Sequence, residues 1–220
     1  VENKADLGIA FDGDGDRCLA VDENGNEIDG DKLLAIISNS LRKKGKLNKD
    51  TIVATVMSNL GLNKYARDNG LELLQTKVGD RYVLEEMLKD GFNLGGEQSG
   101  HVILLDYNPT GDGILTSLML IQAILEEDKK ASELGSMVKL YPQVLINAKV
   151  NADKKYDYEK DATIKEAIEK LEKEFAGNGR VLIRPSGTEP LVRVMIEGED
   201  QEYITKKARE IADLIEEKLK

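Results

Sequence analysis

The 220-residue chain is acidic, with 41 aspartate and glutamate residues against 31 lysine and arginine residues and a formal net charge of −10. Such a charge disfavours non-specific binding to nucleic acid or to an anionic membrane, so neither is expected as a partner. No apolar run approaches the length of a membrane span. The single cysteine, Cys18, excludes an internal disulfide and fits a reducing compartment, which predicts a cytoplasmic protein.

The first 28 residues predict two strands and a tight turn. Apolar runs at 7–11 and 18–21 are typical of buried strands, and Asn24-Gly25 is a strong hairpin signal. Because the chain begins with Val1 and soon enters a strand, we expect it to be a piece of a longer protein.

From residue 29 to about 140, strand-like and helix-like patterns alternate, which predicts an α/β domain with a mixed sheet. The expected strands lie at 52–56, 71–75, around 94 and at 102–105, and the expected helices at 31–45, 60–68, 81–89 and 113–127. After Tyr141-Pro142 the pattern changes to that of a smaller α+β unit, with strands at 144–150, 180–183 and 191–196 and helices at 163–175 and 203–219.

An acidic loop, Asp12-Gly-Asp-Gly-Asp16-Arg17, follows the first predicted strand. Three carboxylates that converge repel one another unless a cation lies among them, and hard oxygen ligands favour Mg²⁺ or Ca²⁺. Arg17 fits a phosphoryl-transfer site, because it can pair with a phosphate that the metal also touches.

The same loop has other interpretations. It is compatible with a plain acidic surface turn. It is also compatible with a calcium-binding module, since Asp12, Asp14, Asp16 and Glu23 have the spacing of an EF-hand loop. Against the EF-hand, Arg17 replaces the required glycine and both flanks predict strands. The run 11–14, Phe-Asp-Gly-Asp, is further compatible with an aspartyl-phosphatase.

Two more loops carry polar groups suited to a phosphosugar. Gly96-Glu-Gln-Ser-Gly-His101 places a carboxylate and a hydroxyl on one turn, as paired sugar hydroxyls require, although an ordinary hairpin turn is the alternative. The turn from Arg184 to Arg193 joins two strands and gathers arginine forks, hydroxyls and backbone N–H groups that suit phosphate, the alternative being an unrelated surface turn.

A fourth segment, Thr76-Lys-Val-Gly-Asp-Arg81, lies between a strand and a helix. Arg81 is a candidate phosphate contact and Asp80 a candidate to orient it. The alternative is that Asp80 caps the following helix. The general base is not identified by these residues.

The acidic loop, the 96–101 turn and the 184–193 turn together resemble the metal, sugar and phosphate loops of the α-D-phosphohexomutase family, in that order and over essentially the whole chain. Gln98 and the phosphate loop are most similar to the phosphoglucosamine mutase branch. The resemblance implies metal ligands Asp12, Asp14 and Asp16 for Mg²⁺, and catalytic candidates Arg17, Asp80, Arg81 and His101. It further implies substrate-binding residues Glu97, Ser99, Arg184, Ser186, Gly187, Thr188 and Arg193.

The resemblance also implies a domain organisation and an activity. Residues 1–28 would be the tail of the second hexomutase domain, 29–140 the third domain and 141–220 the fourth. The family's phosphoserine loop is a Ser-His-Asn-Pro-like run, and the sequence contains none. The chain alone is therefore expected to be inactive, with the N-terminal domains of the same enzyme as its partner and a homodimer as a further expectation. The full enzyme would interconvert glucosamine 6-phosphate and glucosamine 1-phosphate; a phosphomannomutase or phosphoglucomutase is the near alternative.

Overall fold

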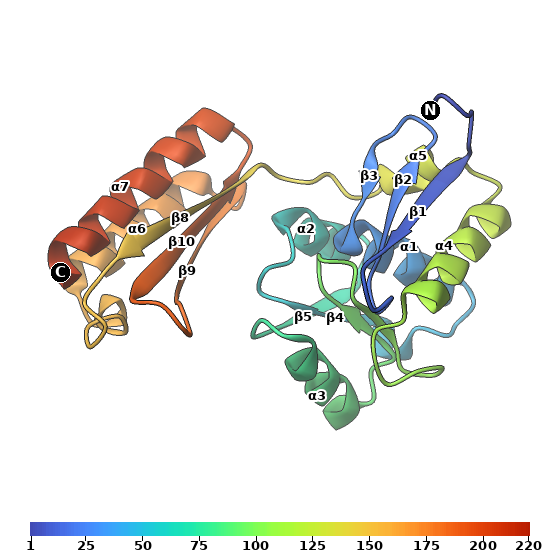
Figure 1. Ribbon diagram of the computed structural model, residues 1–220, viewed down its shortest axis with the longest axis horizontal. Helices are drawn as coiled ribbons and strands as arrows, with labels where there is room; N and C mark the ends of the chain where they lie inside the picture. Colours follow the sequence, from blue (N-terminus) through green and yellow to red (C-terminus); the bar gives the residue numbers. More distant parts are fainter. The chain divides into compact units, whose positions relative to one another are not determined.

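The computed structural model describes residues 1–220 and divides them into two compact units, Val1–Leu140 and Tyr141–Lys220. Figure 1 shows the helices and strands of each unit. None of the helices is both long enough and apolar enough to cross a membrane.

The N-terminal unit begins with a small antiparallel sheet in the order β1-β2-β3. Its strands are β1 (Leu7–Phe11), β2 (Cys18–Asp22) and β3 (Glu27–Ile28). Phe11 lies opposite Cys18, so residues 12–17 form the loop that closes the first hairpin. The acidic loop is therefore held at both ends by one pair of strands.

The second sheet of this unit is mixed, as the sequence predicts. Its order is β5-β4-β6-β7, with β4 parallel to both neighbours and β7 antiparallel to β6. The strands are β4 (Thr51–Thr55), β5 (Glu72–Thr76), β6 (Leu94–Gly96) and β7 (Val102–Leu104). The 97–101 turn connects β6 to β7, so the candidate sugar loop closes a β-hairpin.

Helices cover both faces of this second sheet. They are α1 (Gly30–Lys43), α2 (Leu60–Asp68), α3 (Asp80–Asp90), α4 (Gly113–Glu127) and the short α5 (Ala131–Gly135). Successive side chains of a strand point to opposite faces. Accordingly, Ile52 and Ala54 join the core that includes α1, whereas Val53 packs with Val83 and Met87 of α3. The result is an α/β/α sandwich.

Side-chain caps fix where the functional helices begin. Asp29, Asn59 and Asp112 accept hydrogen bonds from the backbone N–H groups of Lys32, Gly61 and Leu115, at the starts of α1, α2 and α4. A cap of this kind typically contributes about 1 kcal/mol. By contrast, α3 begins after Gly79 with no side-chain cap, so the alternative in which Asp80 caps this helix is wrong.

The C-terminal unit has an antiparallel sheet in the order β8-β10-β9 and two helices. Its elements are β8 (Gln143–Lys149), α6 (Ala162–Phe175), β9 (Gly179–Pro185), β10 (Leu191–Gly198) and α7 (Gln201–Leu219). Val192, Val194 and Ile196 of β10 are fully buried in a core shared with both helices. The alternate residues of β10, including Arg193, therefore lie on the face away from α6 and α7.

The sequence missed three short helices. α5 follows a lysine-rich stretch without clear periodicity, and the 3₁₀ turns Asn48–Asp50 and Asp157–Glu159 are single turns. Helices this short carry too few residues for a helical period to be visible. The predicted fold class, a mixed-sheet α/β domain followed by a smaller α+β domain, is confirmed.

Candidate active site

The acidic loop brings its three aspartates together. Each of Asp12, Asp14 and Asp16 offers a carboxylate oxygen, and these oxygens all lie within 4.8 Å of one another. Burial acts to raise the pKa of Asp12, but the hydrogen bond from the Arg17 N–H, a hydrogen bond with the Asp16 side chain and then the Arg17 charge outweigh it, and the pKa is lowered. Asp12 therefore loses its proton more readily than a free aspartate does.

Arg17 partly balances that charge. Its guanidinium Nε lies 3.6 Å from Asp12 Oδ2 and 3.9 Å from Asp16 Oδ1, and about half of its side chain is exposed.

The surroundings of the acidic loop differ from those of an EF-hand. The loop is flanked by β1 and β2, and the Glu23 carboxylate accepts hydrogen bonds from the backbone N–H and the hydroxyl of Ser132. An EF-hand is excluded, because the flanking helices are absent and the required twelfth ligand is bound elsewhere.

The sugar loop is joined directly to the metal loop. The Cys18 N–H donates to the carbonyl of Gly100 at 3.0 Å, and Arg17 and His101 form an isolated antiparallel bridge. Gly100 has φ +92°, and a Cβ there would lie 2.2 Å from the Cys18 carbonyl oxygen. Only glycine permits both this backbone conformation and this approach.

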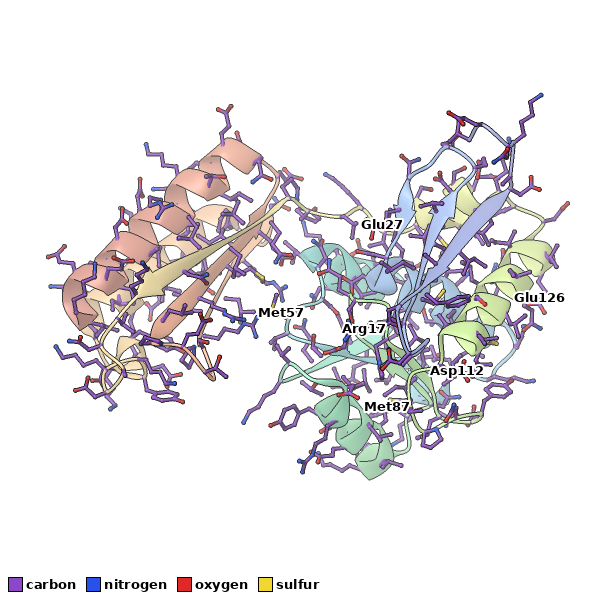
Figure 2. The ribbon with its side chains drawn as sticks, in the orientation of Figure 1. Arg17, Glu27, Met57, Met87, Asp112 and Glu126 are labelled. Atoms are coloured by element: carbon purple, nitrogen blue, oxygen red, sulfur yellow. The ribbon has the colours of Figure 1, made fainter.

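The start of α4 holds the metal loop from another direction. The Gly113 N–H donates to the carbonyl of Gly15 at 2.9 Å. A Cβ at Gly113 would lie 2.7 Å from the Arg17 carbonyl oxygen, so the helix terminus lies in contact with the loop backbone. Figure 2 labels Arg17 in the metal loop and Asp112, which caps this helix.

His101 connects the sugar loop to the metal loop through its side chain. The residue is only 4% exposed, and its Nδ1 lies 3.0 Å from Asp16 Oδ2. Its Nε2 accepts the N–H of Gly111 at 3.1 Å. Both ring nitrogens are therefore engaged by the protein.

Glu97 and Ser99 line a pocket of about 520 Å³ with Asp29, Gln98, Thr55 and Met57 among its other walls. The Glu97 carboxylate accepts the N–H of Gly79 through Oε1 at 3.1 Å. Gln98 turns towards Asp29, with 3.4 Å between its Nε2 and Asp29 Oδ2. The second carboxylate oxygen of Glu97 and the exposed Ser99 hydroxyl are available to bind a ligand in this pocket.

Asp80 and Arg81 have different surroundings. Asp80 Oδ2 lies 3.8 Å from His101 Nε2, at the edge of the same cluster. Arg81 instead pairs with Glu85 of its own helix at 2.7 Å and is 81% exposed, and this hydrogen bond raises the pKa of Arg81. No contact brings Arg81 to the metal or sugar loop, and its role stays a prediction.

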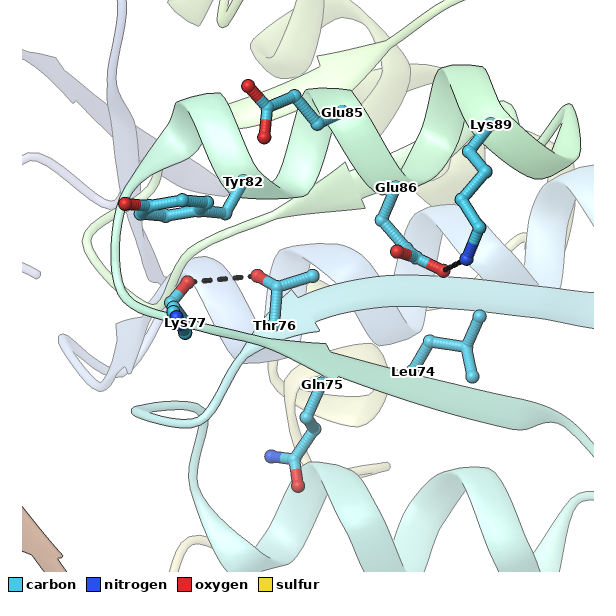
Figure 3. Close-up of a pocket in the computed structure, with 8 residues that line it drawn as sticks. All are labelled: Leu74, Gln75, Thr76, Lys77, Tyr82, Glu85, Glu86 and Lys89. Atoms are coloured by element: carbon cyan, nitrogen blue, oxygen red, sulfur yellow. Dashed lines mark hydrogen bonds and ion pairs between the residues drawn. The ribbon is translucent and has the colours of Figure 1, made fainter.

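A groove of about 450 Å³ lies between β5 and α3 (Figure 3). It contains none of the metal-loop or sugar-loop residues, and its lining is Leu74, Gln75, Thr76, Lys77, Tyr82, Glu85, Glu86 and Lys89. The ion pair between Lys89 and Glu86 shown there is a surface pair at 3.3 Å. This groove is therefore separate from the pocket that Glu97 and Ser99 line.

The phosphate loop of the C-terminal unit places two arginines side by side. Arg184 of β9 and Arg193 of β10 are direct cross-strand partners. Burial, and then the charge of Arg193, lower the pKa of Arg184, and its buried Nε has no hydrogen-bond partner. Like charges directly opposite destabilise a sheet, so this arrangement fits an anion that binds both.

A second cross-strand pair on the same strands, an arginine and a glutamate, provides a contrast. Arg180 lies opposite Glu197, with 2.5 Å between Nε and Oε2, and Glu197 is fully buried. Arg180 and Arg184 are four residues apart and so share one face of β9. One cross-strand pair on this face is thus an ion pair. The other is two arginines, whose only carboxylate partner is the exposed Glu189, 3.8 Å from Arg193 Nη2.

The turn between Arg184 and Arg193 is organised by Ser186. Its hydroxyl accepts the N–H of Glu189 at 3.2 Å, and its backbone carbonyl accepts from the Lys155 ammonium at 3.0 Å. Gly187 and Thr188 are exposed at the tip, and nothing lies within 4 Å of where a Gly187 Cβ would be. The backbone at this tip is therefore open to close approach by a ligand.

Sequence reasoning missed Lys155, Gly79, Gly111 and Gly113 as parts of these sites. Lys155 adds a positive charge beside the phosphate loop, and the three glycines supply the N–H groups that bond Glu97, His101 and the metal loop. A lysine in a charged segment and glycines in loops carry no distinctive local signal. Their positions become informative only when the long-range contacts are known.

Family models match most of the chain. The model "Phosphoglucomutase/phosphomannomutase, alpha/beta/alpha domain III" matches residues 29–141, and the model of the C-terminal domain of the same family matches residues 145–214. The chain belongs to the phosphoglucomutase/phosphomannomutase family. Its two matched segments correspond closely to the mixed-sheet domain and the smaller domain described above.

Relatives within this family have a common name. The chain is 60% identical over 219 residues to a phosphoglucosamine mutase of Caldicellulosiruptor saccharolyticus, and the aligned region covers 100% of this chain and 49% of that protein. It is 60% identical over 218 residues to a phosphoglucosamine mutase of Ruminiclostridium cellulolyticum, covering 99% and 49% respectively. The chain thus spans about half the length of the curated relatives it matches.

Solved structures of the phosphohexomutase superfamily show the same fold. An N-acetylglucosamine-phosphate mutase in its product complex matches with a TM-score of 0.76 at 22% identity, over 95% of this chain and 48% of that one. The Aspergillus fumigatus N-acetylphosphoglucosamine mutase, solved with GlcNAc-6P and magnesium, matches with a TM-score of 0.74 at 22% identity, over 95% and 48%.

The metal loop of this family member fits a hard divalent cation. Asp16 Oδ1 is buried and accepts no hydrogen bond, which is costly for a carboxylate unless a cation compensates it. Three carboxylates form an all-oxygen donor set, the type that Mg²⁺ prefers. The all-oxygen donor set and the unpartnered Asp16 Oδ1 both fit a hard divalent cation such as Mg²⁺.

Proposed function

We propose that the protein to which this chain belongs interconverts glucosamine 6-phosphate and glucosamine 1-phosphate by Mg²⁺-dependent phosphoryl transfer. The observation that carries the proposal is the joint between the metal loop and the sugar loop, made by the Cys18–Gly100 hydrogen bond and the His101–Asp16 contact. This joint supports a cation site beside a carboxylate and a hydroxyl that would suit a sugar. Identity of 60% along the chain to phosphoglucosamine mutases supports the choice of substrate.

Asp12, Asp14 and Asp16 would hold Mg²⁺, which when bound neutralises charge on the transferring phosphoryl group. Arg17 is half exposed and loosely held, and would turn from the aspartates to the phosphoryl oxygens. Asp80 stands beside His101 at the edge of the cluster, where it would help to fix the local charge. Arg81 remains a candidate phosphate contact.

Glu97 and Ser99 would bind sugar hydroxyls in their pocket, with Glu97 oriented by the Gly79 N–H. In the C-terminal unit, Arg184 and Arg193 would bind the phosphate that is not being transferred, together with the tip residues Ser186, Gly187 and Thr188. The like-charge arginine pair supports this role, because a phosphate dianion converts its repulsion into two charge-assisted interactions.

We further propose that residues 1–28 belong to a preceding domain, 29–140 form the third domain and 141–220 the fourth. The phosphoserine would lie in N-terminal domains outside this sequence, so the chain alone would bind ligand without turnover. Cytoplasmic location and a homodimer of the full-length protein belong to the same proposal. The fully buried single cysteine fits a reducing compartment.

A phosphomannomutase or phosphoglucomutase is the second candidate, favoured by the name of the family model alone. An assay of the full-length protein on glucosamine, mannose and glucose phosphates separates the two. Preference for the amino sugar is expected; preference for mannose or glucose phosphate would refute the proposed substrate.

For this chain, the test is calorimetry with glucosamine 1-phosphate and Mg²⁺, beside a mutase assay. Binding without turnover is expected. Turnover by the chain alone would show that a separate phosphoserine domain is not needed, and the proposed mechanism would be wrong. Glu97→Gln and Arg193→Gln are the matched variants, since they remove one sugar contact and one phosphate contact respectively.

A further inference from the structure

We infer that Lys155 is a positioning residue of the phosphate loop: its ammonium group holds the Ser186–Gly187 peptide so that the Gly187 N–H is presented to a bound phosphate. The inference rests on the proposed phosphate site. It extends that site to a residue outside the 184–193 turn, because Lys155 lies in the segment between β8 and α6.

The contact that carries the inference joins two segments that are far apart in the sequence. The Lys155 ammonium donates to the carbonyl of Ser186 at 3.0 Å, across 31 residues. No carboxylate pairs with this ammonium, whose other contact is the Tyr156 ring with its centroid 5.3 Å away. A half-buried lysine therefore directs its charge at a backbone oxygen of the phosphate loop.

The segment that carries Lys155 is itself anchored at two other points. The Asn151 N–H donates to the carbonyl of Leu219 in α7 at 2.9 Å. Tyr158 is buried, and its hydroxyl lies 3.3 Å from the carbonyl oxygen of Ile183 in β9. Because the segment is held before and after Lys155, the ammonium is delivered to the loop by the fold and not by a free surface side chain.

The bond to the Ser186 carbonyl fixes the direction of the next N–H group. The C=O and N–H bonds of a trans peptide unit point in opposite directions, so the Gly187 N–H points away from the Lys155 ammonium. The other polar groups of Ser186 are also engaged. Its N–H donates to the Leu191 carbonyl at 2.9 Å, and its hydroxyl accepts the Glu189 N–H at 3.2 Å. This peptide cannot turn over without breaking a charge-assisted hydrogen bond.

The N–H groups at the tip of the turn have no acceptor within the chain. Gly187 and Thr188 are exposed, and neither N–H makes a hydrogen bond. Successive backbone N–H groups in a turn form an anion site, and a hydrogen bond to the carbonyl of a peptide polarises it and strengthens its N–H as a donor. A phosphate bound by Arg184 and Arg193, which flank the turn, would meet N–H groups already oriented towards it.

The test is a titration of the 220-residue chain with inorganic phosphate, followed by the amide signals of Gly187 and Thr188. Lys155→Met removes the ammonium and keeps most of the aliphatic stem, and it should weaken phosphate binding about 10-fold. Before phosphate is added, the Ser186 carbonyl carbon signal should already shift in this variant, because its donor is gone. Lys155→Arg keeps a charged donor and should restore most of the affinity and of the carbonyl signal.

Lys154→Met is the matched control. The Lys154 ammonium also donates to a backbone carbonyl, that of Lys220 at 3.1 Å, at the far end of the chain from the phosphate loop in sequence. The variant removes the same charge from the same segment. It should leave the Ser186 carbonyl signal unchanged and weaken phosphate binding by less than about twofold, because salt screens a charge that makes no contact with the loop.

Three results would overturn the inference and leave the phosphate site standing. The first is an unchanged affinity in Lys155→Met when Arg193→Gln weakens binding. The second is a loss of affinity in Lys155→Met with the Ser186 carbonyl signal unmoved, since the lysine would then act through its charge alone. The third is an equal loss in Lys154→Met. Failure of the unchanged chain to bind phosphate would instead overturn the phosphate site, and the inference with it.

Discussion

Replacing Arg193 by glutamine should stabilise the C-terminal unit and weaken its binding of phosphate. Arg193 lies directly opposite Arg184, where cross-strand Cβ atoms are about 5 Å apart and like charges are destabilising by up to roughly 1 kcal/mol. Removing one charge should therefore gain about 0.5–1 kcal/mol, because the ion pair lost with it, to Glu189 at 3.8 Å, is a surface pair that contributes little. The loss of a charge-assisted anion contact should weaken phosphate binding roughly 10- to 150-fold, since such bonds contribute about 1.5–3 kcal/mol.

Amide hydrogen exchange along β10 measures the stability of this unit separately from that of the other. In the absence of phosphate, Arg193→Gln should slow exchange roughly 2- to 5-fold at Val194 and Ile196. Titration with inorganic phosphate, followed by the amide signals of Gly187 and Thr188, gives the affinity. The stability of the unit should rise and its affinity for phosphate should fall.

Arg180→Gln is the matched control, because it removes the same kind of charge from the same face of the sheet. Its partner Glu197 is fully buried, so loss of this ion pair should destabilise the unit by about 3 kcal/mol and speed exchange. Phosphate affinity should stay close to that of the unchanged chain. If Arg193→Gln destabilises as Arg180→Gln does, or leaves phosphate affinity intact, the arginine pair is structural and the anion site is wrong.

Three further outcomes are expected. Burial raises the pKa of the Cys18 thiol from 9.0 to about 11, so alkylation of the folded chain at pH 8 should be on the order of 100-fold slower than that of the unfolded chain. Because the thiol ionises first in the unfolded chain, the free energy of unfolding should also fall as pH rises from about 9 to about 11. Equal alkylation rates for the folded and unfolded chain would contradict this. Gly100→Ala should destabilise the N-terminal unit by at least about 2 kcal/mol in urea unfolding, because of its positive φ and the Cys18 carbonyl, while Gly13→Ala, with nothing near its Cβ, should be nearly neutral. In the full-length protein, Glu97→Gln should weaken phosphosugar binding roughly 10-fold or more, whereas an unchanged affinity would remove Glu97 from the site.

Much of the fold follows from local sequence signals. The helix at 60–68 and the helix at 113–127 have the predicted bounds, because an asparagine or aspartate cap precedes an apolar period in each. The mixed sheet was predicted from alternation of strands and helices. α5 was missed because it has five residues, and its position depends on the contact between Ser132 and Glu23, which are far apart in the chain.

The candidate site could be predicted only in part, for a physical reason. Residue types and spacing identify which side chains can bind a metal or a phosphate, and the aspartates do converge. The partner of each side chain depends on contacts across the fold, such as Asp16 with His101 and Glu97 with Gly79. The register that sets Arg184 against Arg193 is likewise invisible in a list of strands.

Each unit contains a cluster of like charges with a buried polar atom that lacks a hydrogen bond, and the two clusters have opposite signs. In the N-terminal unit the metal loop gathers carboxylates and leaves Asp16 Oδ1 buried without a hydrogen bond. In the C-terminal unit two arginines lie opposite each other, and Arg184 Nε is buried without a hydrogen bond. A folded chain tolerates such costs where a ligand removes them, because strain and unsatisfied groups concentrate at functional sites. One cluster is negative and calls for a cation, and the other is positive and calls for an anion. Under the proposed function, a bound Mg²⁺ would balance the first and a substrate phosphate the second, which would account for two arginines lying opposite each other in an acidic chain with a net charge of −10.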